Sequence, residues 1–261
     1  IKELIGKNRG REGIFAKPKA HRMTLIKSIS GIRGTIGGPP SENLTPLDAV
    51  KFAAAYGTWL MKYREKKDLR VVIGRDARLS GPMIQQLVSA TLTGLGIDIV
   101  DLGLSTTPTV ELAVPMEKAD GGIILTASHN PKQWNALKLL NERGEFLNAE
   151  DGKRILELAS GDDYRYAQVD DLGTYSKMKN GIDRHIQEVL KLKLVDREAI
   201  KKAGFKVVLD AVNSTGGIAI PKLLEELGVE CIKLYCDPSG EFPHNPEPLP
   251  AHLEEISELV V

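Results

Sequence analysis

Short apolar, β-branched segments alternate with helical patterns through the first half of the chain, and this alternation restricts the fold more than any other feature. Three such segments are bounded by glycine or charged residues, as buried strands are: 70–74, 96–102 and 121–126. Helical patterns run from Thr45-Pro46 to about Met61, from about Pro82 to Thr93, and from Thr107 to about Glu117. Helices between strands form crossover connections, so the sequence predicts an α/β fold, a three-layer αβα domain with a mostly parallel mixed sheet.

A second α/β unit of the same type is predicted after a polar stretch. Residues 160–173 have the composition of a linker. The segments that follow are a helix from about 176 to 192, a strand over 205–210, a helix over 214–227 and a strand over 229–235. The chain ends at Val261 inside a further helical pattern, which indicates an incomplete domain. We therefore expect a basic extension (1–22), a first domain (23–160), a linker (161–174) and an incomplete second domain (175–261).

The charged residues exclude several classes of partner. Lys and Arg total 35 and Asp and Glu total 35, so no basic excess indicates nucleic acid. Residues 1–22 hold seven basic and two acidic side chains, and Met23 precedes the first patterned segment. We interpret 1–22 as an extension upstream of the native start rather than a targeting sequence. No apolar run is long enough for a membrane span, so a small molecule is the expected partner, and no oligomeric state is indicated.

The two cysteines, Cys231 and Cys236, give no sign of a metal site. No further histidine or cysteine cluster completes a zinc site around them. Two plain thiols are typical of a reducing compartment, which predicts a cytoplasmic location.

The segment Thr126-Ala-Ser-His-Asn-Pro131 contains the strongest candidate for chemistry. It follows the apolar strand 121–125, so Ser128 is expected at the carboxyl end of a strand, where open α/β sheets bind their ligands. Lys138 lies in the strand-like segment 136–140. Taken alone, Ser128 would be interpreted as part of a polar loop that caps the next helix, and Lys138 as the solvent-facing member of a strand.

These residues resemble the active-site serine segment of the α-D-phosphohexomutases, the family of phosphomannomutase, phosphoglucomutase and phosphoglucosamine mutase. Three further segments agree in order and spacing and extend the resemblance over 24–261: Ser30–Gly34, Gly74–Gly81 and Asp210–Gly217. The resemblance implies an intramolecular phosphotransferase that interconverts hexose or hexosamine 1-phosphate and 6-phosphate. It assigns to Ser128 the phosphate that is given to the sugar and recovered from a bisphosphorylated intermediate.

The same resemblance implies roles for neighbouring polar residues. Lys138 is the general base or acid toward the sugar hydroxyl, and burial near other cations would lower its pKa for that task. His129 is given a supporting catalytic role, since adjacent residues of an extended strand point to opposite faces. Arg33, on a glycine-flanked turn, is expected to act in catalysis and to bind phosphate. Arg75 and Asn130 are the other expected substrate- or phosphate-binding residues.

Two further segments have both a structural and a functional interpretation. In Gly74–Gly81 one Arg–Asp contact is expected to hold the strand end, with Arg78 as the scaffold residue. Ser214–Gly217 opens a helix and is either an anion site or an N-cap.

The cofactors implied by the resemblance are Mg²⁺ and a hexose 1,6-bisphosphate activator. The family binds Mg²⁺ between the serine phosphate and closely spaced aspartates of a second-domain loop, and residues 1–261 contain no D-x-D-x-D pattern. Ser128, through its phosphate, is therefore the one metal-binding residue expected in this chain, and we expect the chain alone to be inactive. The preferred hexose is not readable from these residues.

Two alternative functions stay open. One is a sugar-phosphate-binding fragment without catalysis. The other is a serine hydrolase built on Ser128, although the glycines of a G-x-S-x-G elbow are absent around that serine.

Overall fold

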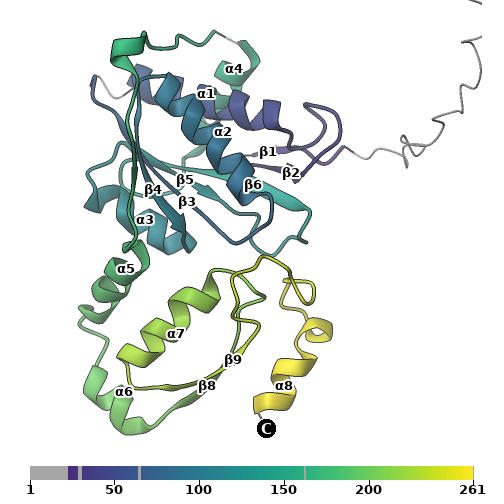
Figure 1. Ribbon diagram of the computed structural model, residues 1–261, viewed down its shortest axis with the longest axis vertical. Coiled ribbons are helices and arrows are strands. Elements are labelled where there is room, and N and C mark those ends of the chain that lie inside the picture. The colour runs from purple at the N-terminus through teal and green to yellow at the C-terminus, as the bar shows by residue number, and fades with distance from the viewer. Residues whose placement is uncertain (1–22, 29–30, 64–65, 162, 261) are drawn as a thin grey trace, which may run out of the picture.

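Two α/β units, one above the other in Figure 1, make up the computed structural model, which describes residues 23–28, 31–63, 66–161 and 163–260. The upper unit is built on a seven-stranded sheet with helices on both faces, and the lower unit on a two-stranded sheet. The extension expected over 1–22 lies outside the described residues, as does Ser30.

The large sheet has the strand order β1-β2-β6-β5-β3-β4-β7. Its strands are β1 (Ile26–Ser28), β2 (Gly31–Thr35), β3 (Arg70–Arg75), β4 (Asp98–Leu104), β5 (Gly121–Leu125), β6 (Trp134–Leu140) and β7 (Tyr175–Lys177). The pairs β5-β3, β3-β4 and β4-β7 are parallel, whereas β5-β6, β6-β2 and β2-β1 are antiparallel. The predicted α/β fold with a mixed sheet is confirmed, and the predicted helices form the crossovers between β3, β4 and β5.

Alternate side chains of the strands point into two separate cores. The helices over the sheet are α1 (Pro46–Tyr63), α2 (Gly81–Gly94), α3 (Thr107–Met116) and α4 (Ala149–Gly161), of which α4 was not predicted. Val71 and Ile73 of β3 belong to the core beneath α1, α2 and α4, whereas Val72 belongs to the core beneath α3. We name these two sides of the sheet the α2 face and the α3 face. The two-residue period of a strand therefore assigns each polar side chain of the sheet to one of them.

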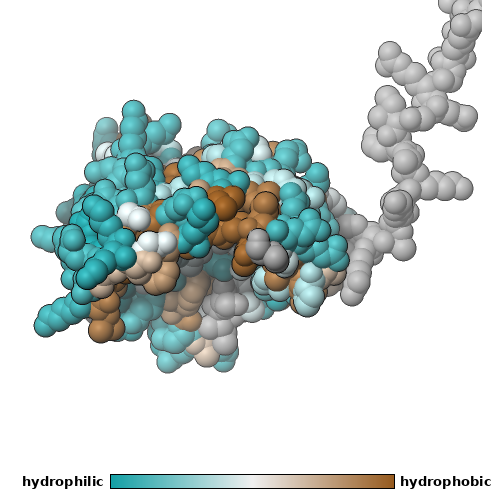
Figure 2. Space-filling view, turned by 90° about the horizontal axis from the view of Figure 1, so that it is seen from below, coloured by the Kyte–Doolittle hydropathy of each residue, from teal (hydrophilic) through white to brown (hydrophobic). Residues whose placement is uncertain are grey.

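The lower unit repeats the strand–helix–strand arrangement on a smaller scale. Its elements are α5 (Gly181–Leu190), α6 (Arg197–Ala203), β8 (Lys206–Asp210), α7 (Gly216–Glu226), β9 (Glu230–Leu234), the 3₁₀ turn η2 (Pro250–His252) and α8 (Glu254–Val260). β8 and β9 are parallel and are joined by α7, as predicted. The core cluster of fully buried residues here is only Ile182, Ile186 and Ala219. Seen from this end, hydrophobic residues reach the middle of the surface (Figure 2).

The segment between the two units differs from the prediction. The helix expected over 176–192 begins at Gly181, because Tyr175–Lys177 forms β7 and pairs with β4 of the large sheet. Thr174 anchors this strand: its backbone N–H and its hydroxyl donate to the Asp98 carboxylate at 2.8 and 2.7 Å. A short 3₁₀ turn, η1 (Val169–Asp171), precedes it. Sheet pairing thus joins Tyr175–Lys177 to the large sheet of the upper unit.

No helix in the described part of the chain has the length and apolarity needed to cross a bilayer.

Candidate active site

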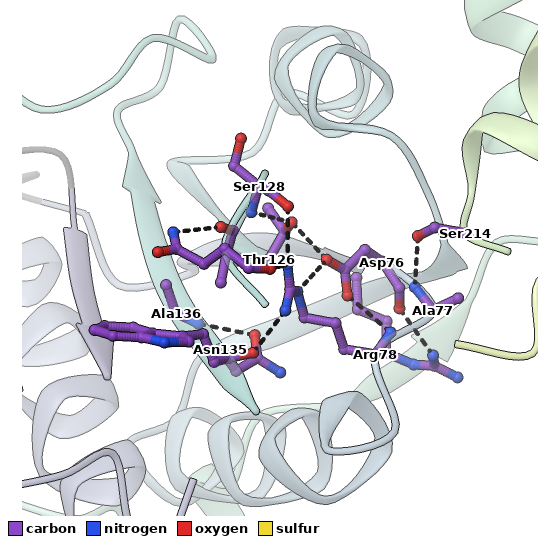
Figure 3. Close-up of polar contacts among 12 residues, drawn as sticks. Asp76, Ala77, Arg78, Thr126, Ser128, Asn135, Ala136 and Ser214 are labelled. Carbon is purple, nitrogen blue, oxygen red and sulfur yellow. Dashed lines mark hydrogen bonds and ion pairs between the residues drawn. The ribbon is translucent and has the colours of Figure 1, made fainter. Parts of the chain in front are cut away.

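Ser128 lies just beyond the carboxyl end of β5, with its side chain exposed (Figure 3). Its backbone has φ +55°, in the left-handed region that a non-glycine residue adopts at a cost of roughly 1–3 kcal/mol. The Ser128 N–H donates to the Thr126 hydroxyl at 3.1 Å. The surrounding structure must therefore hold this turn in place. The Ser128 side chain is exposed at the edge of the sheet where α/β proteins bind their ligands.

The guanidinium of Arg78 holds the loop that contains Ser128. Arg78 is 1% exposed, and its Nη2 donates to the carbonyl oxygens of Ser128 and Asn130 at 2.8 and 2.7 Å. Its Nη1 donates to the carbonyls of Pro131 and Trp134 at 2.8 and 3.0 Å. Burial lowers the pKa of this guanidinium, against the opposing effect of a nearby carboxylate. A single buried cation therefore fixes four carbonyls of one loop.

Asp76 balances that charge and ties β3 to β5. Its Oδ2 accepts from Arg78 Nε at 3.0 Å and from the Thr126 hydroxyl at 2.6 Å, while Oδ1 accepts from the Arg78 backbone N–H at 3.0 Å (Figure 3). The predicted Arg–Asp contact at the strand end is present, with Arg78 as the scaffold residue.

Lys138 and Arg33 lie on the α3 face, beside this loop. Lys138 pairs with Ile124 in the register of β6 and β5, and Ile124 belongs to the α3-face core. Lys138 is partly buried, and burial lowers its pKa, an effect that Glu111 and Asp76 oppose and that Arg33 and Arg78 reinforce. Lys138 thus interacts electrostatically with Asp76 and Arg78, the pair that holds the Ser128 loop, and with Arg33.

Arg33 occupies a strand rather than the predicted turn. It lies within β2, opposite Ala136 of β6, with an exposed side chain. The flanking glycines serve packing: a Cβ at Gly31 would lie 2.4 Å from the Leu137 carbonyl oxygen, and one at Gly34 would lie 2.9 Å from the Leu44 backbone nitrogen. The glycines thus let β2 fit against its neighbours and leave Arg33 on the open part of the α3 face.

The other three predicted site residues, His129, Asn130 and Arg75, occupy different surroundings. His129 is exposed and makes no side-chain hydrogen bond within the part of the chain that the structure describes. The Asn130 side-chain amide donates to the Ala127 carbonyl at 2.8 Å and closes the loop. Arg75 lies on the α2 face, where its Nε donates to Gln85 at 2.8 Å, so the structure does not place it with Lys138 and Arg33.

The lower unit contacts Ala77 and Arg78 through Ser214, which the sequence singled out, and through Gly240 and Phe242, which it did not. The ring of Phe242 has its centroid 5.0 Å from the Arg78 guanidinium carbon. Gly240, with φ +77°, packs so closely that a Cβ there would lie 1.9 Å from the Ala77 carbonyl oxygen. The Ser214 hydroxyl accepts from the Ala77 N–H at 3.4 Å (Figure 3), and Thr215 gives α7 no side-chain N-cap bond. Ser214 thus contributes to the contact between the two units.

Metal-binding residues do not gather at this site. Among the described residues there is no group of three or more His, Cys, Asp or Glu side chains able to hold a metal ion. The carboxylate of Asp76, which is bonded to the arginine that holds the Ser128 loop, uses both oxygens for Arg78 and Thr126.

Comparison with known proteins gives consistent relatives. Two family models match: phosphoglucomutase/phosphomannomutase alpha/beta/alpha domain I over 25–165 and domain II over 183–261. A phosphoglucomutase/phosphomannomutase of Thermococcus kodakarensis is 37% identical over 230 residues, which are 87% of this chain and 50% of that protein. A probable phosphoglucosamine mutase of Methanopyrus kandleri is 32% identical over 232 residues, 88% of this chain and 48% of that protein. The chain thus spans about half the length of these relatives.

Solved structures give the same picture. A putative phosphomannomutase from Thermus thermophilus superposes with a TM-score of 0.76 at 27% identity, over 92% of this chain and 52% of that one. A phosphoglucomutase/phosphomannomutase family protein from Burkholderia thailandensis has a TM-score of 0.73 at 26% identity, over 90% of this chain and 50% of that one.

Replacing Arg78 tests whether it holds the loop. Lysine keeps the positive charge, but its single nitrogen cannot reach four carbonyls, so Arg78→Lys should lower the free energy of unfolding by about 1–3 kcal/mol, the cost of leaving a buried acceptor without its hydrogen bond. Amide hydrogen exchange over 127–134 should also accelerate. The control, Arg143→Lys, changes an exposed arginine paired with Glu145 and should alter neither measurement. Unchanged exchange over 127–134 in Arg78→Lys would show that other contacts hold the loop.

Proposed function

Because the chain belongs to the phosphoglucomutase/phosphomannomutase family, we propose that its protein is a phosphohexomutase that moves a phosphoryl group between the 1- and 6-positions of a hexose or hexosamine phosphate. Relatives that are named as phosphoglucomutase, phosphomannomutase and phosphoglucosamine mutase support this class of substrate. In this proposal Ser128 is the residue that is phosphorylated.

One observation supports the assignment of Ser128 above the others. An exposed serine in a left-handed turn is held by a buried arginine, and two basic residues lie on the adjoining strands β2 and β6. Phosphoryl transfer needs a fixed acceptor and nearby positive charge more than it needs a strong covalent catalyst. A rigid loop, Lys138 and Arg33 meet that need.

The proposed reaction has two transfers related by symmetry. In the first, the bond between phosphorus and Ser128 Oγ breaks while a bond forms between phosphorus and a hydroxyl oxygen of the sugar phosphate. The proton of that hydroxyl goes to the neutral amine of Lys138. After the bisphosphorylated sugar turns over, its other phosphoryl group returns to Ser128 Oγ, and Lys138 gives the proton to the oxygen that is released. Arg33 stabilises the phosphate that does not react, and His129 and Asn130 orient the substrate.

The environment of Lys138 suits this role. A general base must be neutral, and burial lowers the pKa of Lys138 below the ordinary value for lysine. The fraction of neutral amine at a given pH is larger when the pKa is lower. We therefore expect the rate to rise with pH up to the pKa of Lys138.

Magnesium is implied by the family, and the described residues do not fit it by themselves. They contain no cluster of suitable ligands, and Asp76 is already occupied by Arg78 and Thr126. In the proposal the phosphate of Ser128 would hold Mg²⁺ together with carboxylates that the described residues do not supply, and the ion would neutralise charge on the transferred phosphoryl group. A hexose 1,6-bisphosphate would load the phosphate onto Ser128.

The alternative of a serine hydrolase has no support from the site. A hydrolase would need a base bonded to Ser128, and His129 makes no hydrogen bond to it among the described residues.

A cytoplasmic location remains part of the proposal, together with the absence of nucleic acid and membrane partners. It rests on the substrate class and on the free thiols of Cys231 and Cys236.

Phosphorylation of Ser128 can be measured directly. Protein expressed from the complete gene and incubated with glucose 1,6-bisphosphate should gain one phosphate, and peptide mapping should locate it on Ser128. Ser128→Ala should abolish it, whereas Ser214→Ala, at the contact between the two units, should not. Phosphate on another residue would contradict the assignment of Ser128 as the phosphorylated residue, and so would covalent labelling of Ser128 by a fluorophosphonate.

Substitutions of Lys138 and of Arg33 should change the kinetic constants in different ways, because Lys138 transfers a proton and Arg33 binds a phosphate group. In the complete enzyme, Lys138→Ala should lower kcat by about 10²–10⁴-fold, the usual contribution of a general base. Lys138→Arg keeps the charge but stays protonated, so it should lose as much and flatten the pH profile. Arg33→Ala should raise KM as well. A near-normal kcat in Lys138→Ala would show that Lys138 is not the general base.

Residues 1–261 alone should not interconvert glucose 1-phosphate and glucose 6-phosphate. The described residues supply no metal site, and losing a metal or a charged clamp in such a transfer costs several kcal/mol of transition-state stabilisation, roughly 10²–10³-fold or more. A coupled assay with Mg²⁺ on this chain and on the complete protein makes the comparison. Robust turnover by 1–261 would contradict our account of what the reaction requires.

A further inference from the structure

A cavity of about 810 Å³ lies between the two units, on the side of the sheet away from Lys138. Its walls come from α2, from β4 and β7, and from α5 and α7 of the lower unit. Asp101 of β4 and Lys177 of β7 are register partners, and Asp101 lies two residues after Ile99, which belongs to the α2-face core. No residue from 126 to 138 lines the cavity. The space is thus separate from the Ser128 site, and its volume is that of a small-molecule pocket.

The cavity has a surplus of positive charge. Four cationic side chains line it (Arg75, Lys177, Lys179 and Lys222), against the two carboxylates of Asp101 and Asp183, which leaves a net charge of +2. Asp183 is already paired with Lys222 at 2.7 Å. Lys177 and Lys179 form no ion pair within the described residues. A doubly charged anion would therefore neutralise the cavity.

Asp101, an acidic residue in the wall of the cavity, has its carboxylate bonded to donors of the protein itself. Asp101, 6% exposed, accepts from the Gln85 amide, from the Tyr175 hydroxyl and, at 2.7 Å, from the Gly103 N–H. Burial and the adjacent carboxylate raise the pKa of Tyr175 to about 12, so this hydroxyl keeps its proton. Asp101 is thus occupied within the wall. Lys177, Lys179 and the Nη2 of Arg75 remain for a ligand, since Arg75 Nε and Nη1 donate to Gln85 and to the Asp76 carbonyl.

Helix α2 contributes one polar and one apolar residue to the wall of the cavity. The hydroxyl of Ser89, a lining residue that is 6% exposed, has no hydrogen-bond partner among the described residues, and a buried polar atom left in this state calls for an explanation. Beside it, Ala90 adds an apolar wall, continued by Leu102, Ile182 and Ile218 from the other elements. The lining therefore offers a polar contact and an apolar surface beside the cations.

We propose that this cavity is a second ligand site, for a phosphate monoester with an apolar ring, distinct from the Ser128 site. The phosphate dianion lies among Arg75, Lys177 and Lys179, and the ring lies between Ala90 of α2 and Ile218 of α7. Because the walls belong to both units, a bound ligand stabilises the arrangement in which α5 and α7 line the same cavity as α2. The same arrangement holds Phe242 against Arg78, so the site would modulate the loop of Ser128. The proposal does not depend on the chemistry at Ser128.

Binding of phenyl phosphate, measured by isothermal titration calorimetry, tests the site. One saturable site is expected on the protein and on Ser128→Ala. Inorganic phosphate, which lacks the ring, and phenol, which lacks the phosphate, should each bind at least tenfold more weakly. Equal affinity for inorganic phosphate, or loss of binding in Ser128→Ala, would overturn the proposal.

Variants locate the site and separate it from general charge effects. Lys177→Glu with Lys179→Glu should weaken phenyl phosphate binding at least tenfold. The control, Lys193→Glu with Lys202→Glu, makes the same change of net charge at exposed positions outside the cavity and should change affinity less than twofold. Ala90→Trp fills the apolar wall without altering charge and should also weaken binding at least tenfold. Circular dichroism and the Tm verify folding, and equal losses in the control pair and the cavity pair would falsify a specific site.

Discussion

The burial of one guanidinium, that of Arg78, determines the geometry around Ser128. A cation removed from water is tolerable only when its charge and its N–H groups are all matched, because an unpaired buried charge costs several kcal/mol. Asp76 supplies the charge, and four carbonyls of the 128–134 loop supply the remaining acceptors. This pairing leaves the loop little freedom, and it explains how Ser128 keeps a left-handed backbone while its side chain stays exposed.

The same arginine connects the loop to the lower unit. The ring of Phe242 lies against the guanidinium, and the close approach of Gly240 to Ala77 requires the absence of a side chain at that position. Cation–π contacts of this kind contribute on the order of 0.5–2 kcal/mol, enough to bias the placement of one unit against the other without locking it. Movement of the lower unit would therefore alter the contacts of Arg78, which holds the Ser128 loop.

The pleat of the large sheet divides the charged residues into two groups. Lys138 and Arg33 share the α3 face, and Arg75, Asp101 and Lys177 share the α2 face. Residues close in the sequence, such as Arg75 and Arg78, therefore serve different places. The proposed transfer site and the proposed second ligand site therefore lie on opposite faces of the large sheet.

The sequence by itself determined most strands and helices of both units, the position of Ser128 after a buried strand and the scaffold role of Arg78, because these follow from local periodicity and from a recognisable motif. Tertiary structure alone decided which residues meet. Tyr175–Lys177 became a strand because β4 offered an open edge, and the glycines beside Arg33 serve strand packing. Phe242 reached Arg78, and the cavity formed, through contacts between segments far apart in the chain. Local patterns contain no information on such pairings, since burial and charge compensation are properties of the assembled layers.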